Sequence, residues 1–540
     1  MARGYREWSL AGWREHLPGV PDVEAFAAGL GGDTIPALAA ASAAATPGRV
    51  AVTVDGEPMT HAELDDAASR VAGWLARRIR PGDRVLLAAT ASTGFVCCYL
   101  GALRAGAIVV LANPGYTAAE LGHLVTDSGA VLAFADPVPR RLLAGRDSVV
   151  TADVADLPEG DARADAIAAG QQDIALLAYT SGTTGRPKGV PLTHLQLAAS
   201  IRSAMAAWRW SADDVLAHAL PVYHQHGLSG LHTALIAGGT VHIRSRFSPA
   251  DLVRTIGETG ATVLFGVPTI YQSLMSADVA PLRRLRLAVC GSAPLNPVLA
   301  ERLAEVLGRL PLIRYGTTET GLNVSNPLDN PRGDTVGVPL PGVLARVWAA
   351  DGEAGPGADG ELQIRGPHVL AGYWHDPAAT EAAVTADGWF RTGDIGAVDP
   401  ATGHLRIRGR TKEMIITGGL NVYPREVEIV LEEHPSVAEV AVAGVPHERW
   451  GEQVTAWVVM REGHGFEERH QCPRGVGQRH QDSAVHDAAR GAQVRRPVQP
   501  RDHPVGAGLV QDQAELAGER HKRDQGIQVS GHGAELSARC

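Results

Sequence analysis

The stretch YTSGTTGRPKGV, residues 179–190, decides how this chain is interpreted. It follows an apolar run, DIALLAY (173–179), that predicts a buried strand, and it precedes LTHLQLAASIRSAMAAW (192–208), whose apolar spacing predicts a helix. Glycines between a strand and a helix let backbone N–H groups turn inward, and Lys188 adds a mobile positive charge. It is not a Walker loop, because no Gly-Lys-Ser/Thr stands at the required spacing. We expect a phosphate-binding loop, with a flexible surface loop as the alternative.

Composition restricts the classes of protein that the chain can represent. Its 540 residues suffice for two or more domains, and its hydrophobic (45%) and charged (20%) fractions are ordinary for a soluble globular protein. The formal net charge of −10 disfavours a nucleic-acid partner. The most apolar segment, 95–112, is interrupted by Arg104 and glycines, which disfavours a membrane span. With no signal peptide and no metal-ligand spacing among five cysteines, we expect buried free thiols at Cys97 and Cys98 and a cytoplasmic protein.

Apolar runs alternate with helical spacing between residues 59 and 341. Strands are predicted at 84–90, 107–113, 130–136, 173–179, 261–267 and 285–291, and helices at 62–79 and 297–310. This alternation is typical of an α/β fold with doubly wound, mostly parallel sheets. Beyond residue 341, short Gly/Pro-rich strands predict a small barrel-like subdomain. A helical pattern at 427–434 and a strand-like pattern at 437–445 predict the start of a small α+β domain.

Four segments resemble the adenylate-forming superfamily, which contains acyl-CoA synthetases, luciferases and peptide-synthetase adenylation domains. They are YTSGTTGRPKG (179–189), YGTTET (315–320), GWFRTGD (388–394) and GRTKEMIITGGLNVYPREVE (409–428). Their order and spacing are similar to those of the family over about residues 50–460. The resemblance implies an ATP-dependent acid–thiol ligase that uses ATP, Mg²⁺ and coenzyme A. It also implies an adenylation domain at 1–410 and a mobile C-terminal domain that begins at 411 and is incomplete after 461.

The nucleotide site follows from the resemblance residue by residue. The expected ATP- and AMP-binding residues are Thr180, Ser181, Gly182, Thr183, Thr184, Gly185, Lys188, Gly291, Ser292, Ala293, Tyr315, Gly316, Thr318, Asp394 and Arg410. Because adenylation joins two anions, the site needs a metal and fixed cations, and a hard cation prefers carboxylate oxygen. Glu319 is the expected Mg²⁺ ligand, with a helix cap as its alternative role. Asp394 is expected to bind the ribose, with a turn-forming role as its alternative.

The resemblance also assigns residues to catalysis and to domain movement. Thr318, Glu319, Lys188 and His224 are the expected catalytic residues. Lys412 falls on the hinge about which the family's C-terminal domain rotates between its two reactions. Gly418 and Gly419 are expected to line the tunnel for the pantetheine arm of CoA.

The acid is expected to be malonate or a 2-substituted malonate. The segments LPVYHQHGL (220–228) and GGTVHIRSRFS (238–248) resemble those of malonyl-CoA synthetases. An arginine in an acyl pocket is costly unless a second substrate carboxylate pairs with it. Arg246 is the first candidate for that role and Arg244 and Arg286 are weaker ones, while a solvated strand end is the alternative for Arg246. His224 is expected at the pocket entry, and Thr317 stands where a methionine is frequent in that branch.

The pattern breaks near Val459 or Met460. Residues 462–540 contain few large apolar side chains and no sustained period, so we expect a disordered tail. The family's C-terminal lysine has no counterpart, because Lys522 lacks the flanking pattern. A slip of the coding frame near codon 461 would produce such a change, and the loss of the lysine would impair adenylation.

Three other functions stay open. The chain can be a CoA ligase for a fatty or aromatic monocarboxylic acid, or a nucleotide-binding remnant that no longer turns over. Loading of a carrier protein is disfavoured, since no carrier domain is attached.

Overall fold

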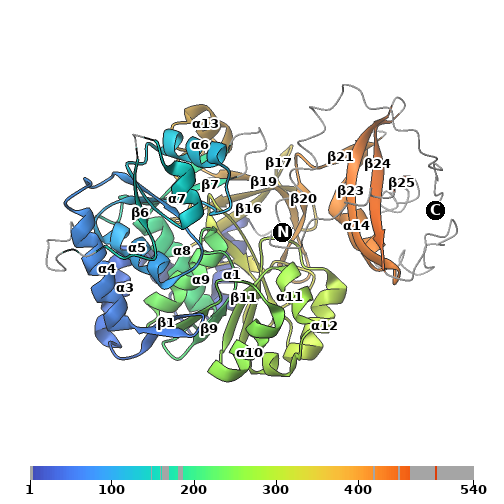
Figure 1. Ribbon diagram of the computed structural model, residues 1–540. Coiled ribbons are helices and arrows are strands. Elements are labelled where there is room, and N and C mark those ends of the chain that lie inside the picture. The colour runs from blue at the N-terminus through green and yellow to red at the C-terminus, as the bar shows by residue number, and fades with distance from the viewer. Residues whose placement is uncertain are drawn as a thin grey trace, which may run out of the picture. The chain divides into compact units, whose positions relative to one another are not determined.

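The computed structural model describes residues 4–146, 149–158, 160, 169–180, 187–417, 420–447, 450–461 and 493–495 (Figure 1). The chain divides into two compact units. The main boundary between them lies between Ile407 and Arg408. One short piece earlier in the chain, Gly393–Ile395, also belongs to the second unit. The domain boundary after residue 410 stays a prediction.

The first unit contains two large sheets. One runs in the order β15 (Val338–Pro339), β14 (Gly321–Ser325), β13 (Leu312–Thr317), β12 (Leu287–Cys290), β11 (Val263–Gly266), β9 (Val215–His218), β10 (Thr240–Ile243), β1 (Val50–Val54) and β2 (Glu57–Thr60). The other runs in the order β6 (Val150–Asp153), β5 (Leu132–Ala135), β3 (Arg84–Ala88), β4 (Ile108–Leu111), β7 (Ile174–Thr180) and β8 (Lys188–Thr193). The pairs from β13 through β1 and from β6 through β7 are parallel, and the outer pairs β1–β2, β13–β14, β14–β15 and β7–β8 are antiparallel. The mostly parallel α/β fold predicted from the sequence is confirmed.

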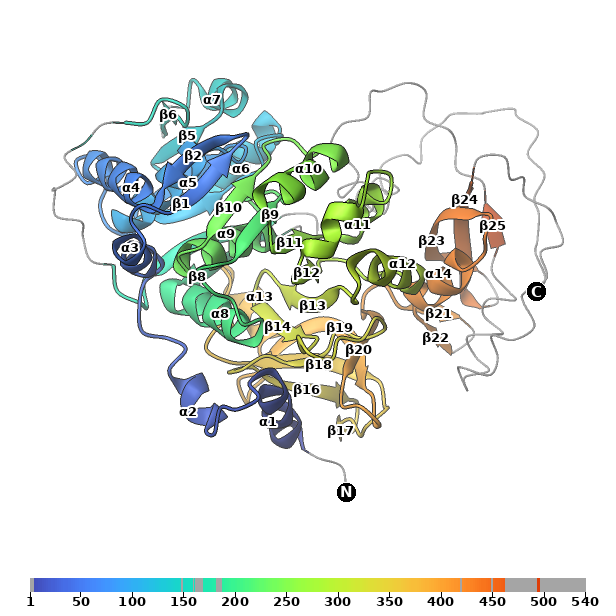
Figure 2. The ribbon, with the colours of Figure 1, turned by 90° about the horizontal axis from the view of Figure 1, so that it is seen from below.

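Helices fill the space between the two sheets and cover their outer faces (Figure 2). Helices α5 (Thr93–Arg104) and α8 (His194–Ala207) pack against strands of both sheets and so form a layer between them. The remaining helices of this unit are α1 (Tyr5–His16), α2 (Val23–Ala28), α3 (Ile35–Ala45), α4 (His61–Leu75), α6 (Ala118–Ser128), α7 (Pro137–Leu143), α9 (Gln225–Ile236), α10 (Pro249–Thr259), α11 (Pro268–Leu274), α12 (Pro297–Leu307), α13 (Pro377–Ala383) and the 3-10 turn Ala280–Arg284.

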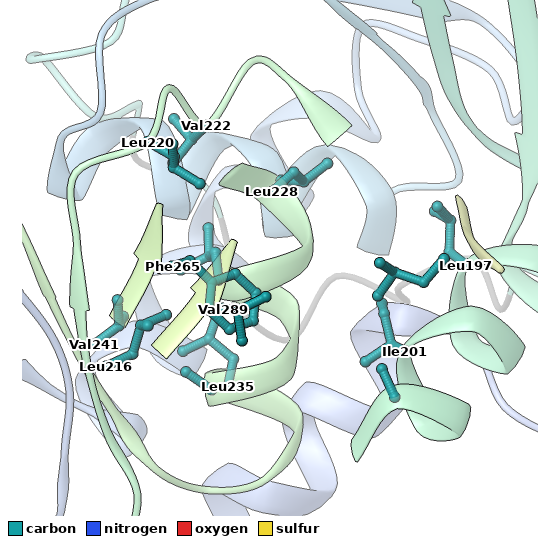
Figure 3. Packing of buried hydrophobic residues seen from close by; sticks show 14 of the residues in the cluster. Leu197, Ile201, Leu216, Leu220, Val222, Leu228, Leu235, Val241, Phe265 and Val289 are labelled. Atoms are coloured by element: carbon teal, nitrogen blue, oxygen red, sulfur yellow. The ribbon is translucent and has the colours of Figure 1, made fainter. Parts of the chain in front are cut away.

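The main core joins α9 to the nine-stranded sheet. Side chains from the helix and from β9, β11 and β12 meet there, among them Leu235, Leu216, Phe265 and Val289 (Figure 3). Each of these four is at most 2% exposed. Burial of this apolar surface fixes the carboxyl ends of the strands, where ligands of open α/β sheets bind.

The strands predicted beyond residue 341 form a separate antiparallel-rich sheet. Its order is β17 (Gly352–Glu353), β16 (Leu344–Ala349), β18 (Gly360–Arg365), β19 (Phe390–Val398) and β20 (Leu405–Arg410). Helix α1 packs on β16, and Trp13 Nε1 donates to the Val343 carbonyl across 2.9 Å.

The second unit is built around one long hairpin. Its sheet has the order β22 (Leu420–Val422), β21 (Ile415–Thr417), β24 (Gly451–Met460) and β23 (Val437–His447), and α14 (Pro424–Glu432) packs on β23. Strand β25 (Gln493–Arg495) pairs in parallel with β24, so three residues of the segment expected to be disordered form regular structure. The rest of the segment after residue 461 lies outside the described residues.

Candidate active site

Lys188 and Glu319 both contact the side chain of Tyr373, the lysine over the ring and the glutamate at the hydroxyl. Lys188 is the first residue of β8, and its Nζ is 5.1 Å from the ring centroid of Tyr373. The Tyr373 hydroxyl donates to Glu319 Oε1 across 3.0 Å, and the Leu370 amide donates to the Glu319 carbonyl across 2.9 Å. Burial and the Glu319 carboxylate raise the pKa of Tyr373, which keeps its hydroxyl a donor at neutral pH. A cation and a carboxylate that belong to segments far apart in the chain therefore share one aromatic support.

Trp374, the residue after Tyr373, connects this segment to β8 by a hydrogen bond. The Trp374 amide donates to the Gly189 carbonyl across 2.9 Å, and its indole Nε1 donates to the Asp127 carbonyl across 3.2 Å. A Cβ at Gly189 would lie 2.8 Å from the Trp374 Cβ. Glycine next to Lys188 is therefore required for this close approach.

Residues 315–320 comprise the end of β13 and the tight turn Thr318–Thr320 that leads into β14. A β-bulge lies between Tyr315 and Gly316, and a Cβ at Gly316 would lie 2.1 Å from the Gly321 carbonyl oxygen. Gly321 has a φ of +57°, which favours glycine. Glu319 lies in a turn that leads into a strand, so the alternative of a helix cap is excluded.

A network of hydrogen-bonded polar side chains holds this turn in place. Thr317 Oγ1 and Thr320 Oγ1 are 2.9 Å apart, and Asn323 Nδ2 donates to Thr320 Oγ1 across 2.6 Å. His368 Nε2 lies 3.0 Å from Asn323 Oδ1. Burial lowers the pKa of His368 to about 4, so the ring is neutral near pH 7. Thr317 thus has a structural partner in addition to its expected place beside the acid.

A second group lies at the carboxyl end of β12, where His226 and Arg314 are buried and Ser292 is exposed. His226 Nδ1 is 3.0 Å from Ser292 Oγ, and Ser292 has a positive φ of +68°. Gly291 follows β12 directly, and a Cβ there would lie 2.6 Å from Arg314 Nε. Burial lowers the pKa of His226 and lowers that of Arg314 to about 10, which leaves the guanidinium charged at neutral pH. The predicted residues 291 and 292 therefore adjoin a cation that sequence reasoning did not consider.

The other predicted residues of the first unit lie on several different elements. Thr180 ends β7 and is paired with Lys188 across the β7–β8 ladder. Thr318 is half-buried in the turn, and Ala293 is exposed beyond β12. His224 precedes α9 with an exposed side chain, and its ring lies 4.8 Å from that of Tyr223.

The three candidate arginines for the acid have different surroundings. Arg246 is exposed beyond the end of β10. Arg244 donates through Nε and Nη2 to Thr255 Oγ1, at 2.8 and 2.7 Å. Arg286 precedes β12 at the opposite end of that strand from Gly291, and its Nε donates to Asp214 Oδ1 across 2.6 Å. Pairing with the buried Asp214 gives Arg286 a structural role, and this position gives no support to contact with the acid.

Two predicted nucleotide residues form an ion pair in the second unit. Arg410 Nε lies 3.2 Å from Asp394 Oδ1, and Asp394 is 5% exposed within strand β19. Because the residue lies inside a strand, the turn-forming alternative for Asp394 is excluded. Lys412 follows closely along the chain, in the turn after β20. Ser181, Gly182, Thr183, Thr184, Gly185, Gly418 and Gly419 lie outside the described residues.

Sequence reasoning missed Tyr373, His226 and Arg314. Tyr373 is part of GPHVLAGYW, which carries no charge pattern that would single it out. His226 and Arg314 stand directly beside recognised motifs, in HQHGL and in RYGTTET. A signal was present for Arg314, since it follows the apolar run LPLI (310–313), and a charged residue that is buried with such a run requires a partner.

Comparison with known proteins gives matches over most of the chain. The model of the AMP-binding enzyme family matches residues 39–374, and that of the AMP-binding enzyme C-terminal domain matches residues 426–490. The chain belongs to the AMP-binding enzyme family. The second match extends beyond the break expected near residue 460.

Relatives within the AMP-binding enzyme family differ in the acid that their names give. A 3-[(3aS,4S,7aS)-7a-methyl-1,5-dioxo-octahydro-1H-inden-4-yl]propanoyl:CoA ligase of Mycobacterium tuberculosis is 37% identical over 81% of this chain and 90% of its own length. A feruloyl-CoA synthase of Amycolatopsis is 36% identical, over 77% and 87%. A mitochondrial malonate–CoA ligase of Mus musculus is 39% identical, over 54% and 57%.

A crystal structure has the same fold. ATP-bound MatB from Rhodopseudomonas palustris superposes with a TM-score of 0.75 at 36% identity, over 80% of this chain and 90% of that one. The named relatives share an acyl-CoA ligase reaction, and this chain is an acyl-CoA ligase of the AMP-binding family. In the described part of the chain, no helix is long and apolar enough to cross a bilayer.

Proposed function

We propose that the chain joins malonate, or a 2-substituted malonate, to coenzyme A at the expense of ATP. The acid carboxylate attacks the α-phosphate of ATP and expels pyrophosphate, which gives an acyl-adenylate. The CoA thiol then attacks the acyl carbonyl, and AMP leaves as the thioester forms. The observation that carries this proposal is the Lys188–Tyr373–Glu319 group, because one tyrosine side chain contacts both a cation and the carboxylate of the Thr318–Thr320 turn.

The chain's own residues bind and orient the reactants. Lys188 offsets the charge of the phosphates, and its position over the Tyr373 ring limits the directions in which its Nζ points. Glu319 fits a magnesium ligand: Tyr373 occupies Oε1, and Oε2 has no protein partner among the described residues. Mg²⁺ commonly uses one or two carboxylates together with substrate phosphates, and when bound it would offset phosphate charge. Within the described residues no cluster of three His, Cys, Asp or Glu forms a separate metal site.

The remaining nucleotide and CoA contacts are part of the same proposal. Asp394 accepts two ribose hydroxyl donors, and Arg410 holds the Asp394 carboxylate in place. Gly291, Ser292 and Ala293 let the adenine ring approach the backbone. The Lys412 hinge and the Gly418–Gly419 tunnel serve the thioester step.

Two observations support the choice of malonate. MatB and the murine ligase, whose name gives malonate, are among the similar proteins. Segment 238–248 also carries arginine where a pocket for a fatty or aromatic acid would be apolar. The similarity to feruloyl-CoA synthase favours the competing proposal, a monocarboxylate ligase.

We also propose that adenylation is slowed in this chain. After Val459 the sequence contains Lys522 alone, without the flanking residues of the family's catalytic lysine. Loss of one positive charge at the reacting carboxylate costs about 100-fold or more in the rate of that half-reaction.

The experiment compares acids under one set of conditions. Pyrophosphate release and acyl-CoA formation are measured with Mg-ATP and CoA for malonate, methylmalonate, ferulate and octanoate. The proposal requires thioester formation with malonate or methylmalonate and none with octanoate. Turnover of ferulate with malonate silent would establish the monocarboxylate ligase. Silence with every acid, in a protein that still binds ATP by calorimetry, would leave the nucleotide-binding remnant.

A further inference from the structure

Asp127 is hydrogen-bonded to two segments that lie far from it in the sequence. It is a half-buried residue of α6. Its Oδ2 accepts a hydrogen bond from the Tyr179 hydroxyl across 2.7 Å, and its backbone carbonyl accepts one from Trp374 Nε1 across 3.2 Å. These partners are 52 and 247 residues away along the chain. Asp127 therefore connects three separate parts of the first unit.

The two partners of Asp127 also meet at Gly189. Tyr179 of β7 is paired with Gly189 of β8, and the Trp374 amide donates to the Gly189 carbonyl across 2.9 Å. The four residues form a closed set of contacts, which we call the Asp127 network. A Cβ at Gly189 would lie 2.8 Å from the Trp374 Cβ, so the network leaves no space for a larger residue there.

Lys188 adjoins the Asp127 network at two points. It directly precedes Gly189 in β8. Its Nζ lies 5.1 Å from the ring centroid of Tyr373, the residue directly before Trp374. The backbone of Lys188 and the ring beneath its ammonium group are therefore both attached to members of the network.

The surroundings favour the hydrogen bond between Tyr179 and Asp127. Both residues are half-buried, and burial together with the Asp127 carboxylate raises the pKa of Tyr179. The hydroxyl therefore keeps its proton and donates at neutral pH. A hydrogen bond to an ionised acceptor is about twice as strong as one between neutral groups. This bond is thus the strongest single link from α6 to β7 in the network.

We propose that Asp127 is a positioning residue for the ATP phosphates and acts through Lys188. This inference rests on the proposed function, but only on its phosphate-binding part, and it does not depend on which acid the enzyme uses. The bond to Tyr179 holds β7, and with it β8, against α6. The bond to Trp374 holds the Tyr373 ring beneath Lys188. A lysine that is already placed loses less side-chain entropy when a phosphate binds.

Loss of the bond to Tyr179 should weaken the binding of ATP more than that of AMP. Without the bond, only a fraction of the molecules hold Lys188 in the binding position, and the apparent affinity falls in proportion to that fraction. One hydrogen bond to a charged acceptor corresponds to about a tenfold change in such a population. AMP lacks the β- and γ-phosphates, which carry most of the charge that a lysine attracts.

The test measures dissociation constants of the full chain by calorimetry, without acid or CoA. The ligands are AMP and, with Mg²⁺, the α,β-methylene analogue of ATP. The variants are Asp127→Ala, Asp127→Asn, Tyr179→Phe, Lys188→Ala and the double variant Asp127→Ala/Lys188→Ala. Asp65→Ala is the matched control, because Asp65 is also a half-buried aspartate on a helix and pairs with Arg104. Melting temperatures are recorded for every protein.

Asp127→Ala and Tyr179→Phe should each bind the analogue about tenfold more weakly and bind AMP within about twofold of the unaltered protein. Asp127→Asn should bind the analogue within about threefold, because its amide oxygen still accepts the Tyr179 hydroxyl. The double variant should bind no more weakly than Lys188→Ala, since Asp127 acts through Lys188. Asp65→Ala should lower the melting temperature and leave the ratio of the two dissociation constants unchanged.

Four results would overturn the inference. Unchanged analogue binding in Asp127→Ala is the first, and an equal loss of analogue and AMP binding, which marks a structural aspartate, is the second. The third is a loss in Asp127→Asn as large as that in Asp127→Ala, and the fourth is additive losses in the double variant.

Failure of the proposed function gives different results. If the unaltered protein binds neither the analogue nor AMP, the proposed function fails and the inference falls with it. If it binds the analogue but forms a thioester from ferulate and none from malonate or methylmalonate, the choice of acid is wrong. The binding constants of the Asp127 variants then still decide the inference.

Discussion

The hydroxyl of Tyr373 donates to the carboxylate of Glu319 across 3.0 Å. The tyrosine belongs to the segment between β18 and α13, and the glutamate belongs to the turn between β13 and β14. One hydrogen bond therefore joins the segment that carries Tyr373 to the turn that carries Glu319, the proposed metal ligand. The same tyrosine ring supports Lys188, so a single side chain orders both charges.

Replacement of Tyr373 by phenylalanine keeps the ring under Lys188 and removes the bond to Glu319. A hydrogen bond to a charged group contributes about 1.5 kcal/mol or more, so pyrophosphate release should fall by about tenfold. Its dependence on Mg²⁺ concentration should shift to higher values. Tyr116→Phe, at another half-buried tyrosine, is the control. Equal rates in Tyr373→Phe and the unaltered protein would show that this bond has no part in the reaction.

Lys188 can be followed chemically because lysines are rare in this chain, which contains Lys188, Lys412 and Lys522. We expect Mg-ATP to protect Lys188 from acetylation by an amine-reactive ester, since the phosphates would cover its Nζ. Peptide mass spectrometry measures the labelled fraction, with Lys522 as the internal reference. Equal labelling of Lys188 with and without nucleotide would place the phosphates elsewhere.

Asp214 and Arg286 provide a test of the fold that is independent of activity. The Asp214 side chain is 3% exposed and accepts bonds from Arg286, Thr262 and the Ser211 amide. Asp214→Asn leaves the guanidinium of Arg286 without its counter-charge and should lower the free energy of unfolding by about 3 kcal/mol. The matched change in the exposed pair, Asp329→Asn beside Arg209, should cost less than about 1 kcal/mol. Chemical denaturation measures both, and similar losses would contradict the assigned burial.

Buried histidines should make the protein sensitive to mild acid. Burial lowers the pKa to about 4 for His16, His194, His218 and His368, from 6.5 in the unfolded chain. Between these values the unfolded chain binds more protons, so stability falls as the pH falls through that window. The slope is at most about 1.4 kcal/mol per pH unit for each histidine. The urea midpoint should be level above about pH 7 and fall from 6.5 towards 4, and a midpoint that holds or rises on acidification would contradict this.

The helices and strands could be predicted from the sequence because the spacing of apolar residues indicates which residues of an element are buried. The strand predicted at 84–90 is observed at Arg84–Ala88, and the helix predicted at 62–79 is observed at His61–Leu75. The predicted C-terminal end of that helix was too late, because Ala76 is already the C-cap. The spacing of apolar residues alone does not mark where a helix ends. The thiols of Cys97 and Cys98 are buried and free, as the apolar helix around them predicted.

Long-range partners did not follow from the sequence. Nothing near Arg286 indicates that Asp214, on a different segment, would pair with it at the amino end of β12. Tyr373 likewise gains its role only because the fold brings it to Glu319. Motif recognition singled out residues with fixed spacing, such as Lys188 and Glu319. It did not single out Arg314, because that residue is notable only for its burial in the folded chain.

The most direct test of the central claim is malonyl-CoA formation by the full chain and by its Glu319→Gln variant, measured by mass spectrometry with Mg-ATP and CoA. We expect malonyl-CoA from the unaltered protein, and a decrease of about 100-fold or more in the variant while it still folds. Absence of malonyl-CoA from the unaltered protein, with thioester formed readily from ferulate or octanoate, would contradict it.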